Sequence, residues 1–158
     1  SPNIVDSMLL LLGRIDLAAI ETAGLINRNV NDEPLSRELD RCVRYAIEVD
    51  SALHRGFLWS AIELLHYMRH SIMELFTYSH DGKRPYQYFQ KEADQKMQVR
   101  LGSTLPQFDL KTAQESLSQF MDVLTNDLDQ LTNNQVKLSE SHSELLNAIR
   151  SRQNALET

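Results

Sequence analysis

The chain has 158 residues, of which 42% are hydrophobic and 24% charged, and its formal net charge at pH 7 is −6. These values are typical of one soluble globular domain, here residues 1–158, that is large enough to bury a core. The negative charge argues against a nucleic-acid binder, because phosphate backbones are bound by clustered Lys and Arg side chains.

The first element in chain order is apolar. Residues 8–13, MLLLLG, form a dense apolar run that is too short to span a bilayer. No basic segment precedes it, so it does not resemble a secretion signal, and we expect a soluble, cytoplasmic protein without a membrane partner. Apolar residues at helical spacing predict a first helix over residues 4–28.

Two long amphipathic helices are expected next. Ser36 is suited to cap the second helix, and Gly56 is placed to end it. Apolar residues at steps of three and four predict a third helix over about residues 58–79. The following segment, HDGKRP at residues 80–85, contains an Asp-Gly turn signal and a proline that cannot continue the helix.

The second half of the chain is also helical in pattern. A short helical piece is expected around residues 90–101. A long fourth helix then begins with Asp109 or Thr112 as its cap. Ser141 and Glu144 fit a capping box for a last helix, because a serine and a glutamate three residues apart can bond each other's backbone N–H groups.

No stretch alternates apolar and polar residues as a strand does. The sequence therefore predicts an all-α protein, an antiparallel up-and-down bundle of four to five helices. The lone Cys42 excludes a disulfide framework, and its place on an apolar helix face predicts a buried thiol. The tail after Arg150 has little to bury and is expected to fray.

The third helix carries an unusual number of titratable and aromatic side chains. Trp59, Glu63, His66 and His70 share a stripe beside the apolar seam, at steps of four, three and four residues. This stripe is either a solvated flank with a snorkelling tryptophan or the wall of a ligand groove. In a groove, Trp59 and Tyr67 would be stacking surfaces, and Glu63 would accept hydrogen bonds from hydroxyl or amine groups.

A second aromatic group follows the turn after this helix. The segment RPYQYF brings Tyr86, Tyr88 and Phe89 close together in sequence. These aromatics either form a lid that closes the end of the bundle or an aromatic rim that positions a ligand, and both roles are compatible.

Arg69 lies among core-facing positions of the third helix. We expect it either to be buried and paired with an acid on a facing helix, Asp122 or Asp127, or to pack its stem while its head reaches solvent. A structural role is favoured over a contact with phosphate.

No complete catalytic or metal motif is present. Glu63 and His66 form one Glu-x-x-His pair, which is half of a di-iron motif, and we find no second pair. Ser103 follows a glycine, as in nucleotidyl-transferring sites. Asp109 comes too soon after it for a magnesium ligand, and Lys111 stands where a second carboxylate is needed. No Ser-His-Asp or Cys-His grouping can be assembled either. We therefore predict no metal bound by this chain.

The run HRGFLWSAIELLHYMRHSIMELF, the turn, KRPYQYF and the helix DLKTAQESLSQFMDVLTNDL together resemble a known family. They resemble the C-terminal helical domain of antibiotic nucleotidyltransferases of the lincosamide and aminoglycoside type, and the related free-standing substrate-binding subunits. The resemblance covers about residues 40–149. It depends on Arg55, Gly56, Trp59, Ala61, Glu63, Leu64, Arg69 and the segment 85–88.

The resemblance implies a substrate-binding helical domain, with a role in antibiotic resistance, that packs against a nucleotidyltransferase catalytic domain. That partner domain, fused or separate, would hold magnesium and nucleoside triphosphate, and this chain would bind no cofactor and would not be catalytic alone. A hydroxylated small-molecule acceptor would lie between the two. Its implied contacts here are Trp59, Glu63, His66, Tyr67, His70, Tyr86, Tyr88 and Phe89. Glu63 would act as a base or as an orienting carboxylate.

Two other classes of function remain open. The chain could be a helical interaction module that acts by docking or as a homodimer, in which case the stripe from Trp59 to His70 would be buried between copies. A metal-dependent bundle oxidoreductase is the weakest alternative, because half of the required ligands are missing.

Overall fold

A computed structural model describes residues 34–156, which form an all-α helical bundle without strands, as predicted. The helices are α3 (Pro34–His54), α4 (Leu58–Ser79), α5 (Pro85–Glu92), α6 (Gln95–Gly102), α7 (Leu110–Asp122), the π-helical segment η1 (Val123–Asp127), α8 (Leu128–Thr132) and α9 (Glu140–Leu156). The first helix predicted over residues 4–28 lies outside the described residues. α3 already includes Ser36, the predicted cap, because it begins with Pro34, and proline suits the first turn of a helix.

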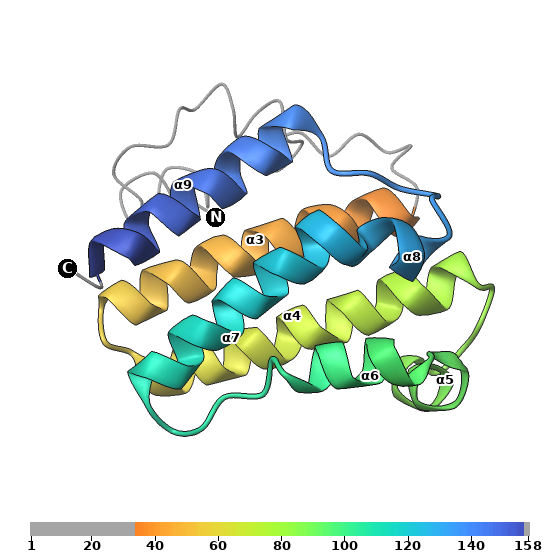
Figure 1. Cartoon of the computed structure of the whole chain (residues 1–158), viewed down its shortest axis with the longest axis horizontal. Helices are drawn as coiled ribbons and strands as arrows, with labels where there is room; N and C mark the ends of the chain where they lie inside the picture. Colours follow the sequence, from red (N-terminus) through yellow and green to blue (C-terminus); the bar gives the residue numbers. More distant parts are fainter. Residues whose placement is uncertain (1–33, 157–158) are drawn as a thin grey trace, which may run out of the picture.

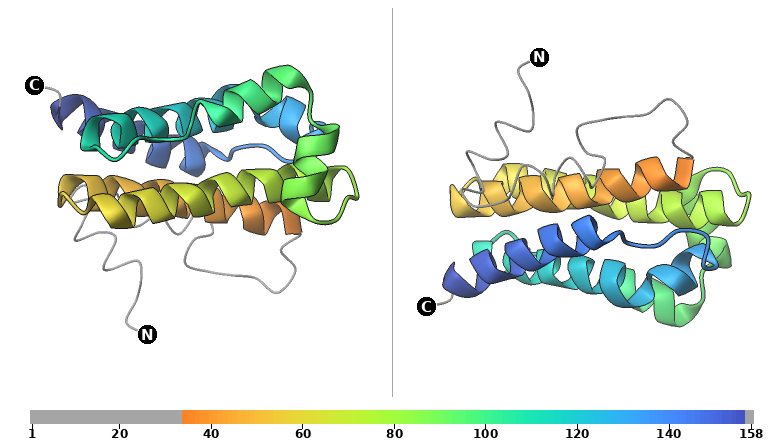
Figure 2. Two further views of the ribbon diagram at one scale, coloured as in Figure 1. Left: turned by 90° about the horizontal axis from the view of Figure 1, so that it is seen from below. Right: turned by 90° about the horizontal axis from the view of Figure 1, so that it is seen from above.

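The described helices form two layers (Figures 1 and 2). α3 and α4 lie side by side in one layer, and α7 and α9 lie across from them in the other. The chain direction alternates through α3, α4, α6, α7 with α8, and α9, which is an up-and-down order. The short α5 packs across the end of α4.

The core lies between the two layers. Each long helix contributes apolar residues at helical spacing, and the largest of those that are fully buried are Leu39, Ile47, Leu65, Met68, Ile72, Leu75, Leu117, Phe120, Met121 and Leu124. Burying each such side chain stabilises the fold by about 1.5–3 kcal/mol relative to exposing it. Cys42 is also fully buried, and this burial raises the pKa of its thiol, in agreement with an unreactive core residue.

Gly56 ends α3 as predicted and turns the chain into α4. Its φ of 72° is a left-handed conformation that favours glycine. The N–H of Phe57 donates to the carbonyl of Ala52 at 2.9 Å, and the N–H of Gly56 donates to that of Leu53 at 3.1 Å. These two bonds form a Schellman motif, which makes α4 antiparallel to α3.

The predicted cap of the last helix is two residues out of register. Ser139, not Ser141, accepts the backbone N–H of His142 at 3.0 Å, and the N–H of Ser139 donates to Nδ1 of His142 at 3.0 Å. Histidine thus takes the place of the expected Glu144 in a reciprocal capping box. Because Nδ1 accepts a hydrogen bond, the ring proton is on Nε2, which donates to Asp40 of α3 at 2.7 Å.

The predicted fourth helix is found, with one interruption. Asp109 caps it by accepting the N–H of Thr112 at 2.7 Å, and the helical path runs through α7, η1 and α8. The π-helical turn at Val123–Asp127 was not predicted. The short helix expected at residues 90–101 is in fact two helices, since the chain is extended at Ala93 and Asp94 between α5 and α6.

Arg69 is buried, but neither predicted acid is its partner. Its Nε donates to Thr104 Oγ1 at 3.0 Å and its Nη2 to the Thr104 carbonyl at 2.7 Å, while the guanidinium lies 5.3 Å from the ring centre of Phe120. Burial lowers the pKa of Arg69, although an arginine remains charged. The loop after α6 is thereby fixed to α4.

The two acids expected near Arg69 pair with other arginines. Asp122 accepts from Arg150 of α9 at 2.7 Å, and Asp127 accepts from Arg100 of α6 at 2.8 Å. The interposed loop residue Thr104 explains the difference, because it occupies the space between α4 and α7 that a direct ion pair would need.

Candidate functional site

Glu63 and Tyr67 form the centre of an exposed polar surface on α4. We call this surface the α4 face and define it as Glu63, His66, Tyr67 and His70 of α4 with Tyr86 of α5. Tyr67 donates its hydroxyl hydrogen to Glu63 Oε1 at 2.6 Å, one helical turn away. This bond raises the pKa of Tyr67, because removing the proton would break it beside a carboxylate.

Tyr86 reaches the same face from a different helix. Arg84 turns the chain with a φ of 62°, and Pro85 begins α5, which directs Tyr86 toward α4. Its ring is stacked with that of His66 at 12° between planes, with centroids 6.4 Å apart, and lies 5.1 Å from that of His70. The Tyr86 hydroxyl is 3.4 Å from Nε2 of His66. The structure therefore brings together the predicted residues His66, His70 and Tyr86.

An acidic group that the sequence did not predict adjoins His70. Nε2 of His70 is 3.2 Å from Glu74 Oε1, and Glu38 of α3 lies nearby with only 6% of its surface exposed. Burial raises the pKa of Glu38, with Arg41 opposing. Glu38 Oε2 and His70 Nδ1 are buried without a hydrogen-bond partner among the described residues. Glu38 could have been noticed only by its spacing of three residues from Arg41, which is common on helix surfaces.

Trp59 marks one end of this surface and is separate from its centre. It is 74% exposed, and its ring lies 4.5 Å from that of Phe108, which is itself 58% exposed. Phe108 belongs to the loop before α7, so this contact joins two segments that are distant in sequence. Trp59 lies one helical turn before Glu63 on α4.

Tyr88 and Phe89 pack into the end of the bundle instead. Phe89 is 4% exposed and meets Phe76 edge to face at 5.3 Å. Tyr88 lies 5.7 Å from Phe76 and donates its hydroxyl to the carbonyl of His80 at 3.3 Å. Their placement agrees with the aromatic lid, and only Tyr86 of the predicted rim lies on the α4 face.

The α4 face offers carboxylate, phenol and imidazole groups but no metal centre. Within residues 34–156, no set of three or more His, Cys, Asp or Glu side chains is arranged to hold a metal ion. None of the described helices is long and apolar enough to cross a membrane. The chemistry available is hydrogen bonding and proton acceptance by Glu63 and the two imidazoles, with Tyr86 as a stacking surface.

Comparisons with known proteins add no family. No protein-family model, curated protein or solved structure matches this chain. The resemblance described from the sequence therefore stays a prediction.

Proposed function

We propose that this chain is the substrate-binding helical domain of a nucleotidyltransferase. It would hold a hydroxylated, antibiotic-like acceptor on the α4 face, next to a catalytic domain that supplies magnesium and nucleoside triphosphate. The chain itself would bind no cofactor and would transfer no nucleotide alone.

The observation that supports this proposal most is the position of Tyr86. It comes from α5, yet it lies against His66 and His70 of α4, next to the Glu63–Tyr67 pair. An exposed helix face that is only solvated does not need an aromatic ring from another helix packed against its histidines. The same contacts would form the wall of a ligand groove, with one stacking surface and several hydrogen-bonding groups.

Glu63 is the residue best placed to contact an acceptor hydroxyl. Its Oε1 takes the hydrogen of Tyr67 at 2.6 Å, and its Oε2 has no partner in the described part of the chain. Tyr67 fixes the carboxylate in one orientation, so Oε2 can orient or deprotonate a hydroxyl. Because Glu63 is exposed here, efficient proton transfer would need a second surface to exclude water, and the catalytic domain would provide it.

Binding measurements test the proposal. We would titrate the chain with lincosamides and aminoglycosides by calorimetry, with and without a cognate catalytic domain. Glu63→Gln should weaken binding by about 10- to 100-fold, because it removes a charge-assisted hydrogen bond. Glu144→Gln is the matched control, since Glu144 is exposed on α9. No binding under either condition, or equal binding by Glu63→Gln and the control, would refute the proposal.

The alternative is an interaction module without a small-molecule ligand. The observation in its favour is the contact between the exposed rings of Trp59 and Phe108, together with the exposure of Leu105 (65%) and Leu110 (41%) in the same stretch of chain as Phe108. Exposed apolar patches of this kind mark contacts with other proteins. Analytical ultracentrifugation of wild type and Trp59→Ala separates the two readings. A dimer that Trp59→Ala abolishes favours the module, and a monomer in both cases favours the ligand.

A further inference from the structure

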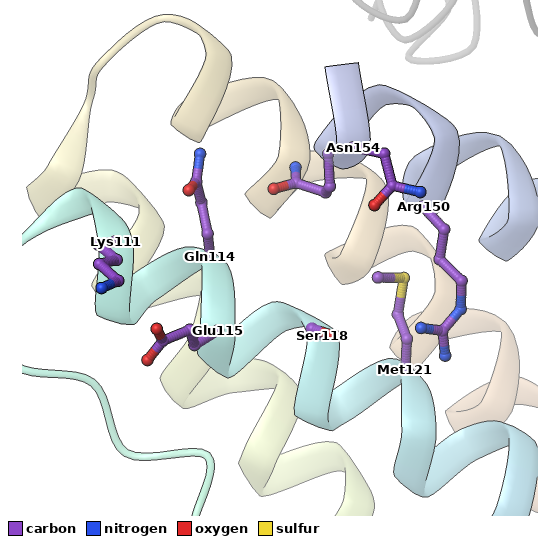
Figure 3. Close-up of a pocket in the computed structure, with 8 residues that line it drawn as sticks. Lys111, Gln114, Glu115, Ser118, Met121, Arg150 and Asn154 are labelled. Atoms are coloured by element: carbon purple, nitrogen blue, oxygen red, sulfur yellow. The ribbon is translucent and has the colours of Figure 1, made fainter. Parts of the chain in front are cut away.

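A pocket lies between α7 and α9, in the layer opposite α3 and α4 (Figure 3). Its volume is about 480 Å³. Met121, which is 1% exposed, lies at its base, with Gln114 and Ser118 of α7 on one side. Arg150 and Asn154 of α9 line the other side. Figure 3 shows Arg150 reaching from α9 toward α7, beside Met121. We call this site the α7–α9 pocket.

Most polar side chains of this pocket have no partner among the described residues. The side chains of Gln114, Ser118 and Asn154 make no hydrogen bond or ion pair with any residue between 34 and 156. Arg150 uses one N–H on Asp122 at 2.7 Å, and both side chains are about one-third exposed. Amide, hydroxyl and guanidinium groups are therefore all available to a ligand.

One wall of the α7–α9 pocket is held in place by a buried ionic cluster. Gln153, which also lines the pocket, donates to the fully buried carboxylate of Asp50 on α3, and Arg152 donates to the same carboxylate at 2.8 Å. These bonds fix α9 against α3. The positions of Arg150 and Asn154 on either side of Gln153 are accordingly well defined.

A further pocket, beside α6, has fewer polar groups available to a ligand. It has a volume of about 330 Å³, but its polar lining groups other than Lys96 already bind one another or adjacent residues. Arg100 donates to Asp127 at 2.8 Å and to Gln119 at 2.7 Å, and Gln130 approaches Asp94 at 3.4 Å. A ligand there would have to break these bonds, whereas the α7–α9 pocket offers donors and acceptors that have no partner among the described residues.

The charges and shapes of the lining indicate the class of ligand. Lys111 and Arg150 are the positive groups of the lining and Glu115 the negative one, and Arg150 is paired with Asp122 beside the pocket, so the charges of the site balance. The remaining groups are amides and a hydroxyl, which both donate and accept hydrogen bonds, and no aromatic ring lines the pocket. We propose that the α7–α9 pocket binds a neutral polyhydroxylated small molecule, such as a sugar ring. This site is independent of the α4 face and of the function proposed for it.

Nuclear magnetic resonance of the isotope-labelled chain tests this proposal with defined probes. We would add methyl α-glucopyranoside, methyl β-galactopyranoside and trehalose in turn and follow the side-chain amides of Gln114 and Asn154. Small, hydroxyl-rich ligands of this size bind open pockets weakly, so saturation is expected at about millimolar concentrations. Saturable shifts of these amides with at least one sugar support the proposal. No saturable shift with any of the three overturns it.

Variants locate the binding and set the control. Asn154→Ala and Gln114→Ala should each weaken the responding sugar by about 3- to 10-fold, the effect of one neutral hydrogen bond. Asn147→Ala should leave sugar binding unchanged, because Asn147 is exposed on α9, as Asn154 is, but lies outside the pocket. Circular dichroism checks that each variant is folded. Equal weakening by all three variants, or saturation by citrate or spermidine but not by sugars, would overturn the proposal.

Discussion

Removing one buried hydroxyl should destabilise this bundle more than removing the buried charge that it binds. Thr104 is fully buried; its Oγ1 accepts from Arg69 at 3.0 Å and donates to the carbonyl of Leu101 at 2.5 Å. Thr104→Val keeps the shape of the side chain and deletes both bonds. It leaves a buried guanidinium N–H without an acceptor, so we expect a loss of about 2–4 kcal/mol in the free energy of unfolding.

Arg69→Met should have a smaller effect. It removes the cation together with its donors, and the flexible methionine fills much of the space. The carbonyl of Thr104 still accepts from Ser116, and its hydroxyl still donates to Leu101. Replacing a buried charge by a hydrophobic residue is often close to neutral, so we expect a change within about 1 kcal/mol. The double variant should be less destabilised than Thr104→Val alone plus Arg69→Met alone.

Urea unfolding measures both changes. Circular dichroism reports the helices, and fluorescence of Trp59, the one tryptophan in the chain, reports the loop after α6 through its contact with Phe108. The control is Thr125→Val, which removes an exposed hydroxyl bonded to its own helix at 2.9 Å and should change stability by at most about 0.5 kcal/mol. If Arg69→Met costs as much as Thr104→Val, or if the two effects simply add, the reasoning is wrong.

Four further variants test other elements. Ser139→Ala should lower stability by about 1 kcal/mol in thermal unfolding, because it removes the cap of α9, and an unchanged midpoint would contradict the capping box. Burial raises the pKa of Glu38 above its ordinary 4.5, so the stability linked to this group is present below that value and is lost as pH rises through the native pKa. Urea unfolding should therefore show Glu38→Gln gaining stability relative to wild type from acid to neutral pH; a constant difference would argue against this. In the same assay Gly82→Ala should cost about 1–3 kcal/mol, because the new Cβ would lie 2.5 Å from the ring of Tyr88. Gly102→Ala places its Cβ within 4 Å of no atom and should instead stabilise α6 by up to about 1 kcal/mol. A greater loss of stability for Gly102→Ala than for Gly82→Ala would contradict these two expectations.

The features that the sequence predicts well are local ones. Apolar spacing predicts α4 within a residue, and Gly56 ends α3 because a left-handed turn needs a glycine there. Asp109 caps α7 for an equally local reason, since its side chain reaches the N–H of Thr112 three residues later. Interactions within one helical turn depend on nearby residues alone, so a pattern in the sequence is enough to find them.

Long-range partners could not be predicted in the same way. Arg69 binds Thr104, 35 residues later, because the loop after α6 passes between α4 and α7, and no periodicity reveals that path. The last cap was placed two residues late because His142 fills a position where the usual pattern has a glutamate or glutamine.

The candidate site was predictable in part for the same reasons. His66 and His70 are one turn apart, so their shared face follows from helical spacing. The sequence could not show which of the three aromatics of RPYQYF pack into the bundle and which lie on the α4 face. Successive residues of a helix rotate by about 100°, so Tyr86 and Tyr88 must point in nearly opposite directions. Contacts with Phe76 decide which of them is turned inward.

Histidine resonances test the central claim, that the α4 face binds the acceptor, most directly. All five histidines of the chain are in the described part, and only His66 and His70 lie on this face. His54 bonds Asp50 of the same helix, while His80 and His142 bond Phe76 and Asp40, so these three serve as internal controls. When a hydroxylated acceptor is added to the chain together with its catalytic domain, the ring C–H signals of His66 and His70 should shift saturably while the other three stay unchanged. No shift of His66 and His70, or shifts confined to the other three histidines, would contradict the account.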